Sequence, residues 1–251
     1  MIICKSAREL EMLYTAGQVV AGAIRAVSEA AAPGVTTGEL ERIATAFIRK
    51  RHGVPAFKDY NGFPGNICAS VNEEVIHGIP SRLRQVKSGD IISIDVGAIV
   101  NGYVGDAAVT LPIGEIDADS ARLLEVTREA LTKGIEQAVI GNRLSDISHA
   151  IQTYVESKGF SVVRDYVGHG VGTTMHEEPQ IPNYGKSGRG PRLRRGMSLA
   201  IEPMVNIGTY EVKVLADKWT VVTKDGARSA HFEHSIAITE QGPWILTQLD
   251  G

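Results

Sequence analysis

The sequence predicts an α+β protein with an internal duplication, because a pair of amphipathic helices followed by a set of apolar strands occurs twice along the chain. The two copies are offset by roughly 110 residues and share little sequence identity. No Gly/Ser-rich or charged linker separates them. We therefore expect residues 1–251 to form a single domain with a central cleft.

Two helices are predicted at the start of the chain by their N-terminal capping signals. Ser6 and Glu9 have capping-box spacing, and apolar residues then recur at helical spacing until Pro33. Thr36 and Glu39 have the same spacing at the start of a second amphipathic segment. The first half therefore opens with a helix pair.

A β-hairpin is predicted next. Residues 90–100 and 103–111 are apolar or alternate in polarity, and Asn101-Gly102 between them is a strong signal for a two-residue turn. A turn at that place would pair position 97 with position 106. The loop at 55–66, which precedes this hairpin, is rich in aromatic residues, Gly and Pro.

The second half repeats this order. Apolar stripes predict helices over residues 118–140 and 144–158. Strands are then predicted over four segments, with Asp225-Gly226 as a further turn: residues 161–167, 197–207, 219–224 and 230–239.

The composition excludes several classes of protein. Hydrophobic residues make up 43% of the chain, which excludes a disordered protein, and the net charge of −3 gives no global positive field that would favour nucleic acid. The N-terminus has no signal-peptide block, no later run of 18 apolar residues occurs, and Cys4 and Cys68 are too few for a disulfide framework. We therefore expect a cytoplasmic protein that avoids membranes, with a monomer as the default state.

Two acidic residues of the predicted hairpin are candidates for a metal site. Asp95 interrupts an apolar strand, where a carboxylate on the inner face would cost several kcal/mol unless it were paired or bound to a metal. The predicted register places Asp95 and Asp106 on one face as diagonal neighbours. The alternative is that Asp106 caps a turn and Asp95 faces solvent.

The second half contains three more candidate ligands. His169 is flanked by glycines at the end of a strand, and Glu202 and Glu233 each lie within an apolar strand that contains no Lys or Arg to pair with them. Ion pairing could explain one such acid, but metal binding explains all of them more simply. Together, the set suits two divalent ions bridged by carboxylates. The reaction class indicated by these residues is metal-assisted hydrolysis, with phosphoesters and amides both open as substrates.

The motifs that contain these residues resemble those of a known family. They read IDVGAIVNGYVGD, GHGVG, MHEEP, IEPM and FEHS in order along the chain, and SVNEEVIHGIP is a further match. This set resembles the type I methionine aminopeptidases of the pita-bread metallopeptidase family over essentially the whole chain. The resemblance implies a duplicated pita-bread fold with pseudo-two-fold symmetry and a central metal cleft. It implies five metal ligands: Asp95, Asp106, His169, Glu202 and Glu233.

The resemblance also implies an activity. Such enzymes remove the initiator methionine from nascent polypeptides when the second residue is small, by means of a hydroxide that bridges two divalent ions. Cobalt, manganese, iron or zinc would suit this donor set. We expect Glu202 to be both a ligand and the proton acceptor for the attacking water.

Further site residues follow from the same resemblance. His176 would contact the scissile carbonyl region and His77 the substrate amide near the leaving side, although each histidine alone would more often be a solvated loop residue. Without the resemblance, the aromatic residues would be taken for ordinary core, and Phe57 and Phe63 stand where related enzymes often have smaller or hydroxylated residues. The expected methionine pocket consists of Phe57, Tyr60, Phe63, Cys68, Met175 and Trp219.

Two additional sites are hypotheses. The resemblance implies a monovalent cation near Asn72, Glu74 and Ser229. Residues 186–195 contain five basic and no acidic residues, so this loop is a candidate for contact with ribosomal RNA, and a solvated surface loop is the simpler explanation.

Three alternatives share parts of this pattern. Xaa-Pro peptidases have the same five ligands but normally carry a large preceding domain, whereas about 90 residues precede Asp95 here. Type II methionine aminopeptidases carry an insertion for which the segment between His176 and Glu202 has no room. An inactive scaffold or RNA-associated protein of the same fold would have lost ligands, and this chain retains all five.

Overall fold

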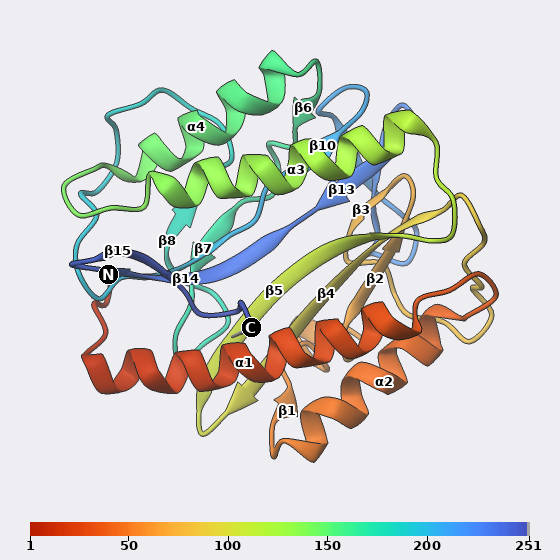
Figure 1. Cartoon of the computed structure of the whole chain (residues 1–251), viewed down its shortest axis with the longest axis horizontal. Helices are drawn as coiled ribbons and strands as arrows, with labels where there is room; N and C mark the ends of the chain where they lie inside the picture. The colour runs from red at the N-terminus through yellow and green to blue at the C-terminus, as the bar shows by residue number, and fades with distance from the viewer. Residues whose placement is uncertain (250–251) are drawn as a thin grey trace.

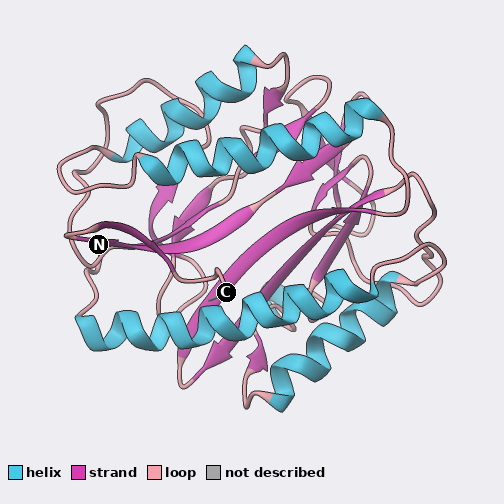
Figure 2. Cartoon of the chain, in the orientation of Figure 1, coloured by secondary structure: helices cyan, strands magenta, loops and turns pink. Residues whose placement is uncertain are grey.

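The computed structural model describes residues 1–249 and has an α+β architecture in which helix pairs flank a curved sheet (Figures 1 and 2). Figure 1 shows the first helix pair along one side of the molecule and the second pair along the other, with the strands between them. The helices are α1 (Ala7–Ala30), α2 (Thr37–Lys50), α3 (Ala118–Glu136) and α4 (Leu144–Ser157), with a short 3-10 turn, η1, at Tyr60–Gly62. None of the helices in the described chain is long and apolar enough to cross a membrane.

The predicted capping boxes form as expected. The hydroxyl of Ser6 accepts from the backbone N–H of Glu9 and the carboxylate of Glu9 accepts from the backbone N–H of Ser6, which satisfies N–H groups that α1 would otherwise leave unpaired. The same reciprocal bonds join Thr36 and Glu39 at the start of α2. Local sequence therefore determines where both helices begin.

The third helix is shorter than predicted. It ends at Glu136 rather than at residue 140, because the side-chain amide of Asn142 donates to the carbonyl of Gln137 and the backbone turns at Gly141, where φ is +97°. The apolar stripe continues past Glu136, and for this reason the periodicity predicts a longer helix than the one that forms.

The main sheet has nine strands, with seven in the order β1-β4-β5-β14-β9-β7-β8, while β2 pairs with β4 and β15 pairs with β14. Neighbouring strands run antiparallel. The strands are β1 (Val54–Pro55), β2 (Cys68–Val71), β4 (Ile91–Val100), β5 (Tyr103–Pro112), β7 (Gly168–Gly170), β8 (Glu177–Ile181), β9 (Ser198–Ile201), β14 (Glu233–Thr239) and β15 (Gly242–Ile245).

Two small sheets lie beside the main one, each with three strands. The first has the order β13-β10-β6, and the second has the order β11-β12-β3. Their strands are β6 (Ser161–Val162), β10 (Met204–Asn206), β13 (Ser229–His231), β3 (Glu74–Ile76), β11 (Val212–Val214) and β12 (Val221–Thr223).

The predicted hairpin register is confirmed. Asn101 and Gly102 both adopt positive φ, as a turn of the I′ type requires, and Gly97 is paired with Asp106. Asp95 is paired with Ala108, so Asp95 and Asp106 lie diagonally on one face.

Strand boundaries in the second half differ from the prediction. The segment 197–207 divides into β9 and β10 around Glu202-Pro203, because Pro203 cannot donate to a ladder and the chain passes there from the main sheet to a small one. The segment 230–239 likewise divides into β13 and β14 at Phe232. The segments 161–167 and 219–224 shorten to β6 and β12.

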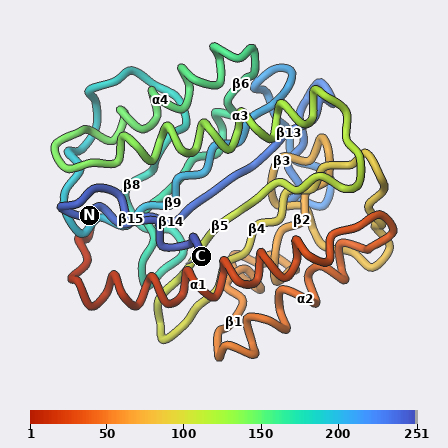
Figure 3. Tube along the Cα trace, viewed as in Figure 1, coloured from red at the N-terminus to blue at the C-terminus, as the bar shows by residue number. Residues whose placement is uncertain are grey.

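Each half has its own apolar core. One cluster, including Leu40, Ile48 and Ile94, packs α1 and α2 onto the first strands. A second cluster, including Leu123 and Ile151, packs α3 and α4 onto the later strands. Figure 3 traces the two halves in sequence, from red to yellow and then from green to blue. This repeated packing is the structural counterpart of the repeated sequence pattern.

Candidate metal centre

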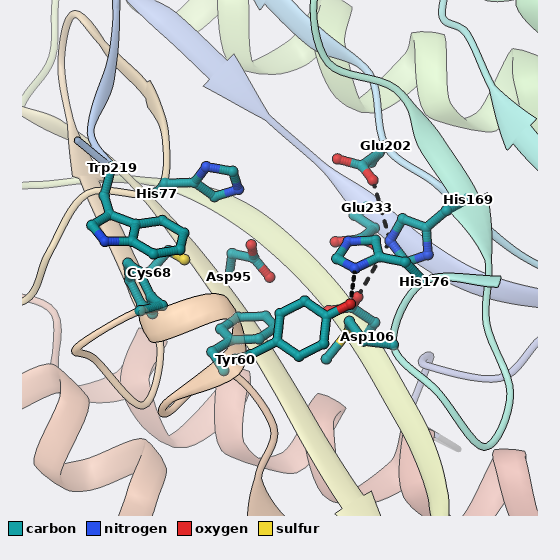
Figure 4. Close-up of a pocket in the computed structure, with 13 residues that line it drawn as sticks. Tyr60, Cys68, His77, Asp95, Asp106, His169, His176, Glu202, Trp219 and Glu233 are labelled. Atoms are coloured by element: carbon teal, nitrogen blue, oxygen red, sulfur yellow. Dashed lines mark hydrogen bonds and ion pairs between the residues drawn. The ribbon is translucent and has the colours of Figure 1, made fainter. Parts of the chain in front are cut away.

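Four of the five predicted metal ligands lie on strands of the main sheet, and Glu202 directly follows a fifth strand, β9 (Figure 4). The strand order β4-β5-β14-β9-β7 brings the two halves of the chain together at the β5–β14 pair, where Glu233 is opposite Ala108. In that order the ligands are Asp95 on β4, Asp106 on β5, Glu233 on β14, Glu202 directly after β9 and His169 on β7.

Three of the candidate acids, Asp106, Glu202 and Glu233, lie around His169. The ligating atoms of Asp106, His169 and Glu233 all lie within 4.8 Å of one another. Nε2 of His169 is 3.6 Å from Oδ2 of Asp106 and 3.5 Å from Oε1 of Glu202. Nδ1 of His169 lies 2.9 Å from the carbonyl oxygen of Gly170, which favours a proton on Nδ1 and leaves Nε2 as a free electron-pair donor toward the carboxylates.

The chemistry of these side chains fits divalent cations. Oδ1 of Asp95, Oδ1 of Asp106 and Oε1 of Glu233 are buried without a hydrogen-bond partner. Among the described residues, the ion pairs of the five candidate ligands involve only histidines as partners and no Lys or Arg. Buried carboxylate oxygens without hydrogen bonds or cationic partners are the ligands that a divalent ion satisfies.

Burial and mutual repulsion act on the acidity of these groups. Burial raises the pKa of Asp95 and the pKa of Glu202 to about 7. Burial also raises the pKa of Asp106 and that of Glu233 well above the usual range, and the neighbouring carboxylates raise both further. The four acids would therefore not all be ionised near neutral pH without nearby positive charge.

His176 lines the same cavity as the candidate ligands and contacts the loop at residues 55–66. Its Nδ1 lies 2.7 Å from the hydroxyl oxygen of Tyr60, and its ring centroid is 4.3 Å from that of His169. A buried ion pair of 2.5 Å between Lys5 and Glu177 anchors the strand that directly follows His176. Figure 4 shows the ring of His176 beside that of His169.

His77 lies on the other side of the cavity, beside Trp219. The two rings meet edge to face with centroids 6.4 Å apart, and His77 adopts a positive φ of 59°. Burial lowers the pKa of His77 to about 4, so the ring is neutral at physiological pH. A neutral imidazole can donate to a peptide carbonyl and accept from an amide N–H.

Five of the six predicted pocket residues form or pack against one apolar cluster, whereas Tyr60 lies outside this cluster, partly exposed, with its hydroxyl on His176. The rings of Phe63 and Trp219 meet edge to face with centroids 5.2 Å apart. A Cβ at Gly97 would lie 2.5 Å from the ring of Phe57 and 2.9 Å from Cε of Met175, so glycine is needed at this position for these side chains to pack. The four acids and the one histidine of the candidate metal set line the cavity. The other lining residues are Phe57, Tyr60, Phe63, Cys68, His77, Met175, His176 and Trp219.

The residues expected near a monovalent cation are engaged in hydrogen bonds with the protein. The backbone N–H of Ser229 donates to the carbonyl of Asn72, and the Asn72 amide donates to Asp90. The carboxylate of Glu74 accepts from the backbone N–H of Val71. Asn72 and Ser229 are therefore adjacent, with Asn72 at a positive φ of 58°.

The basic loop at residues 186–195 is largely exposed but fixed at its base. Asp146 accepts hydrogen bonds from the Ser187 hydroxyl and the backbone N–H of Gly188. Arg195 forms a surface ion pair of 2.8 Å with Glu240. The guanidinium of Arg192 donates to a backbone carbonyl.

Sequence reasoning missed one buried residue of this site, His231. Its Nε2 lies 3.6 Å from Oε2 of Glu202. The signal was present, because His231 and Glu233 are two residues apart and strand alternation favours the same face for both. In the sequence, Glu233 is conspicuous as an acid without a basic partner in an apolar strand. His231 has no comparable signal of its own.

Several known proteins resemble this chain over nearly its whole length. A model of metallopeptidase family M24 matches residues 11–240. Methionine aminopeptidase 1 of Bacillus subtilis is 59% identical over 249 residues, which cover 99% of this chain and 100% of that protein. The crystal structure of a methionine aminopeptidase from Thermotoga maritima superposes with a TM-score of 0.98 at 52% identity, covering 99% of this chain and 100% of that one.

A more distant structure shares the fold alone. The prolidase of Pyrococcus furiosus has a TM-score of 0.79 and 23% identity, and the match covers 99% of this chain but 66% of the prolidase. The pita-bread architecture is thus common to both groups, whereas high identity over the full matched length is found with the aminopeptidases. The family match and the full-length relatives together show that this chain belongs to metallopeptidase family M24.

Proposed function

We propose that this protein is a methionine aminopeptidase that removes the N-terminal methionine from nascent polypeptides when the second residue is small. The observation that carries the proposal is that aromatic pocket residues and all five candidate metal ligands line one cavity. The names of the full-length relatives support the same activity. Because the ligands come from both halves of the chain, we also propose that the halves act as one catalytic domain.

The proposed metal ligands are Asp95, Asp106, His169, Glu202 and Glu233. Asp106 lies on β5 and Glu233 on β14, the two strands at which the halves of the chain meet, so their carboxylates would be available to divalent ions held from either half. Bound ions of this kind polarise the scissile carbonyl and lower the pKa of water toward neutrality. Cobalt, manganese, iron and zinc all suit carboxylates with one imidazole, so the donor set supports a divalent ion without selecting one. The monovalent cation near Asn72, Glu74 and Ser229 remains a separate proposal.

Glu202 is the proposed proton acceptor. Its carboxylate lines the cavity beside His169, where it could accept a proton from a water molecule held at the candidate ligands. Proton transfer from the attacking water to Glu202 and then to the leaving amine would need no further acid. His176 would bond the scissile carbonyl from one side and His77 the substrate amide from the other, as their positions across the cavity support.

Substrate selection follows from the two ends of the cavity. The pocket of Phe57, Phe63, Cys68, Met175 and Trp219 suits an unbranched thioether, and contacts of sulfur with ring edges contribute about 0.3 to 1.5 kcal/mol beyond burial. Tyr60 and the two outer histidines crowd the leaving side. A bulky second residue would displace the scissile bond, and a displacement of about 1 Å can cost a hundredfold in rate.

The test is kcat/KM on Met-Xaa-Gly-Gly peptides with Leu-Ala and Xaa-Pro peptides as controls, measured with purified protein of known metal content. We expect Met-Ala, Met-Gly and Met-Ser peptides to be cleaved and the Met-Lys peptide to be cleaved about a hundredfold more slowly. Comparable rates for Met-Ala and Met-Lys, or faster cleavage of an Xaa-Pro peptide, would favour the prolidase-like alternative.

For the basic loop at 186–195 we propose docking to ribosomal RNA, which would place the enzyme near emerging N-termini. Its exposure and its five basic residues support this proposal. Phosphate contacts weaken steeply as salt increases. Co-sedimentation with ribosomes at low salt should therefore be lost when Arg192, Arg194 and Arg195 are changed to Glu. Unaltered co-sedimentation of that triple variant would refute docking by the loop and leave a solvated surface segment.

A further inference from the structure

His231 is a buried histidine whose ring makes no hydrogen bond. It ends β13 with 2% of its surface exposed, and neither Nδ1 nor Nε2 has a partner among the described residues. Buried side-chain polar atoms in folded proteins are nearly always hydrogen-bonded, so a histidine with a purely structural role would normally have a partner. The ring of His231 therefore calls for a functional explanation.

The ring of His231 lies within ion-pair distance of Glu202, the proposed proton acceptor. Nε2 of His231 lies 3.6 Å from Oε2 of Glu202, while Nε2 of His169 lies 3.5 Å from the other carboxylate oxygen, Oε1. The carboxylate thus lies between two imidazoles. The two rings differ, because Nδ1 of His169 bonds the backbone carbonyl of Gly170 and Nδ1 of His231 has no partner among the described residues. Nε2 of His231 can therefore carry the proton and act as a donor.

The backbone of His231 is fixed to the hairpin that carries Asp95 and Asp106. The N–H of His231 donates to the hydroxyl oxygen of Thr110 at 2.8 Å, and that hydroxyl donates to the carbonyl oxygen of His231 at 2.9 Å. The hydroxyl of Ser93, two residues before Asp95, lies 2.8 Å from the same Thr110 oxygen. All three residues are buried, so the position of the ring is set by the strands that hold the metal centre.

We propose that His231 is a positioning residue whose Nε2–H donates to Oε2 of Glu202, so that Oε1 stays turned toward the metal centre. This inference rests on the metal centre proposed above. A hydrogen bond to one oxygen restrains rotation of the carboxylate and leaves the other oxygen to a metal ion or a proton. Outer partners of this kind typically change metal affinity or activity by about 10- to 100-fold when they are lost.

The test compares H231Q with H231M, two variants of similar length of which only the first keeps an N–H donor. H231L is a second donor-free variant, used in parallel in case H231M does not fold. Co²⁺ affinity is measured by calorimetry on metal-free protein, and the visible absorption spectrum of the Co²⁺ form reports its coordination. We expect H231M and H231L to bind Co²⁺ about 10- to 100-fold more weakly and to lose kcat with little change in KM. H231Q should stay within about threefold of wild type in each measurement.

Two results would overturn the proposal. Wild-type Co²⁺ affinity and kcat in both donor-free variants would show that the bond does nothing, and an equal loss in H231Q and H231M would indicate that the imidazole itself binds metal. Failure of the wild-type protein to bind Co²⁺ would instead refute the underlying metal centre, and that result needs no variant. The two failures are therefore distinguishable.

Discussion

The two halves of the chain reach the metal centre by different routes. In the first half, Asp95 and Asp106 lie inside two long strands joined by a two-residue turn, and the ladder is regular from Ile91 to Val100. In the second half, Glu202 follows the end of a strand, Glu233 begins one after the break at Phe232, and the register shifts directly after His169. Regular strand pairing therefore positions the candidate ligands of the first half, whereas interrupted strands position those of the second half.

The halves also contribute different chemistry. The first half supplies two carboxylates, the neutral His77 and most of the aromatic pocket, which are groups that hold ions and substrate. The second half supplies the other three proposed ligands, His169, Glu202 and Glu233, together with His176, and its Glu202 is the proposed proton acceptor. In a regular hairpin, the alternation of side chains along each strand determines which way a side chain points. At a strand interruption this constraint is lifted, so a side chain there can point in a direction that the regular strand would not allow. Variants in the two halves should thus affect different kinetic parameters.

The largest expected effect is on Glu202. The change Glu202→Gln removes the proposed proton acceptor while retaining the size of the side chain, so kcat on a Met-Ala peptide should fall by more than tenfold, a loss above about 1.4 kcal/mol of transition-state stabilisation. KM should change little, because most of the pocket residues lie in the other half. Steady-state kinetics with metal content checked for each preparation provides the measurement, and retention of more than about a tenth of wild-type kcat would remove Glu202 from this role.

Glu202 should also reduce the stability of the metal-free protein as pH rises. Its pKa is raised from 4.5 to about 7, so its favourable contribution is complete below pH 4.5 and is lost as pH increases to about 7. Relative to Glu202→Gln, the wild type should therefore lose on the order of 3 kcal/mol of unfolding free energy across this window. Urea titrations of both metal-free proteins at several pH values measure the difference. A difference that is constant with pH would show that Glu202 is not held in a strongly perturbed state.

A smaller effect is expected in the first half at Phe63. The change Phe63→Ala removes a buried ring from the pocket wall, where it meets Trp219 edge to face. We expect KM for a Met-Ala peptide to increase about tenfold, because roughly one to three kcal/mol is typical for a lost hydrophobic contact in a specificity pocket, with kcat less affected. Phe63→Leu is the matched control and should be intermediate. Loss of kcat with unchanged KM would contradict the division of labour between the halves.

The smallest expected effect tests the regular hairpin. Gly102 has a φ of +81°, and a Cβ added there would meet no described atom within 4 Å, so Gly102→Ala would be strained by the backbone alone. We expect a loss of about 1 kcal/mol in unfolding free energy. The kinetics should be nearly unchanged, because the long ladder between β4 and β5 would still hold Asp95 and Asp106 in register. Thermal unfolding and peptide assays on one preparation check both parts. A large loss of activity would mean that the register around Asp95 and Asp106 is less secure than the ladder indicates.

The same contrast explains what could be predicted from sequence. The positions of Asp95 and Asp106 followed from Asn101-Gly102, because a turn of known length fixes every pair in the ladder. The break after Glu202 was missed although Pro203 marks it, since the apolar run on either side continues through two different sheets. Periodicity reports which residues are apolar, and it does not report which sheet they join.

Other features depended on contacts between distant residues. The end of α3 depends partly on a hydrogen bond from the side chain of Asn142. The spacing of apolar residues along the helix gives no information about such a bond. The pocket aromatics Phe57 and Phe63 come from a loop, where neither strand nor helix period applies, and only the family resemblance identified them. His231 required its neighbours in space to be seen, because its importance arises from the orphaned ring and the adjacent Glu202.

The central claim is that two divalent ions bind between the halves, held by Asp95, Asp106, His169, Glu202 and Glu233. Anomalous diffraction from crystals of the Mn²⁺-loaded protein tests this most directly. We expect two peaks per chain in the cavity, one contacting His169 and Glu202 and the other contacting Asp95, with Asp106 and Glu233 touching both. A single peak, or ions bound away from these five side chains, would contradict the account.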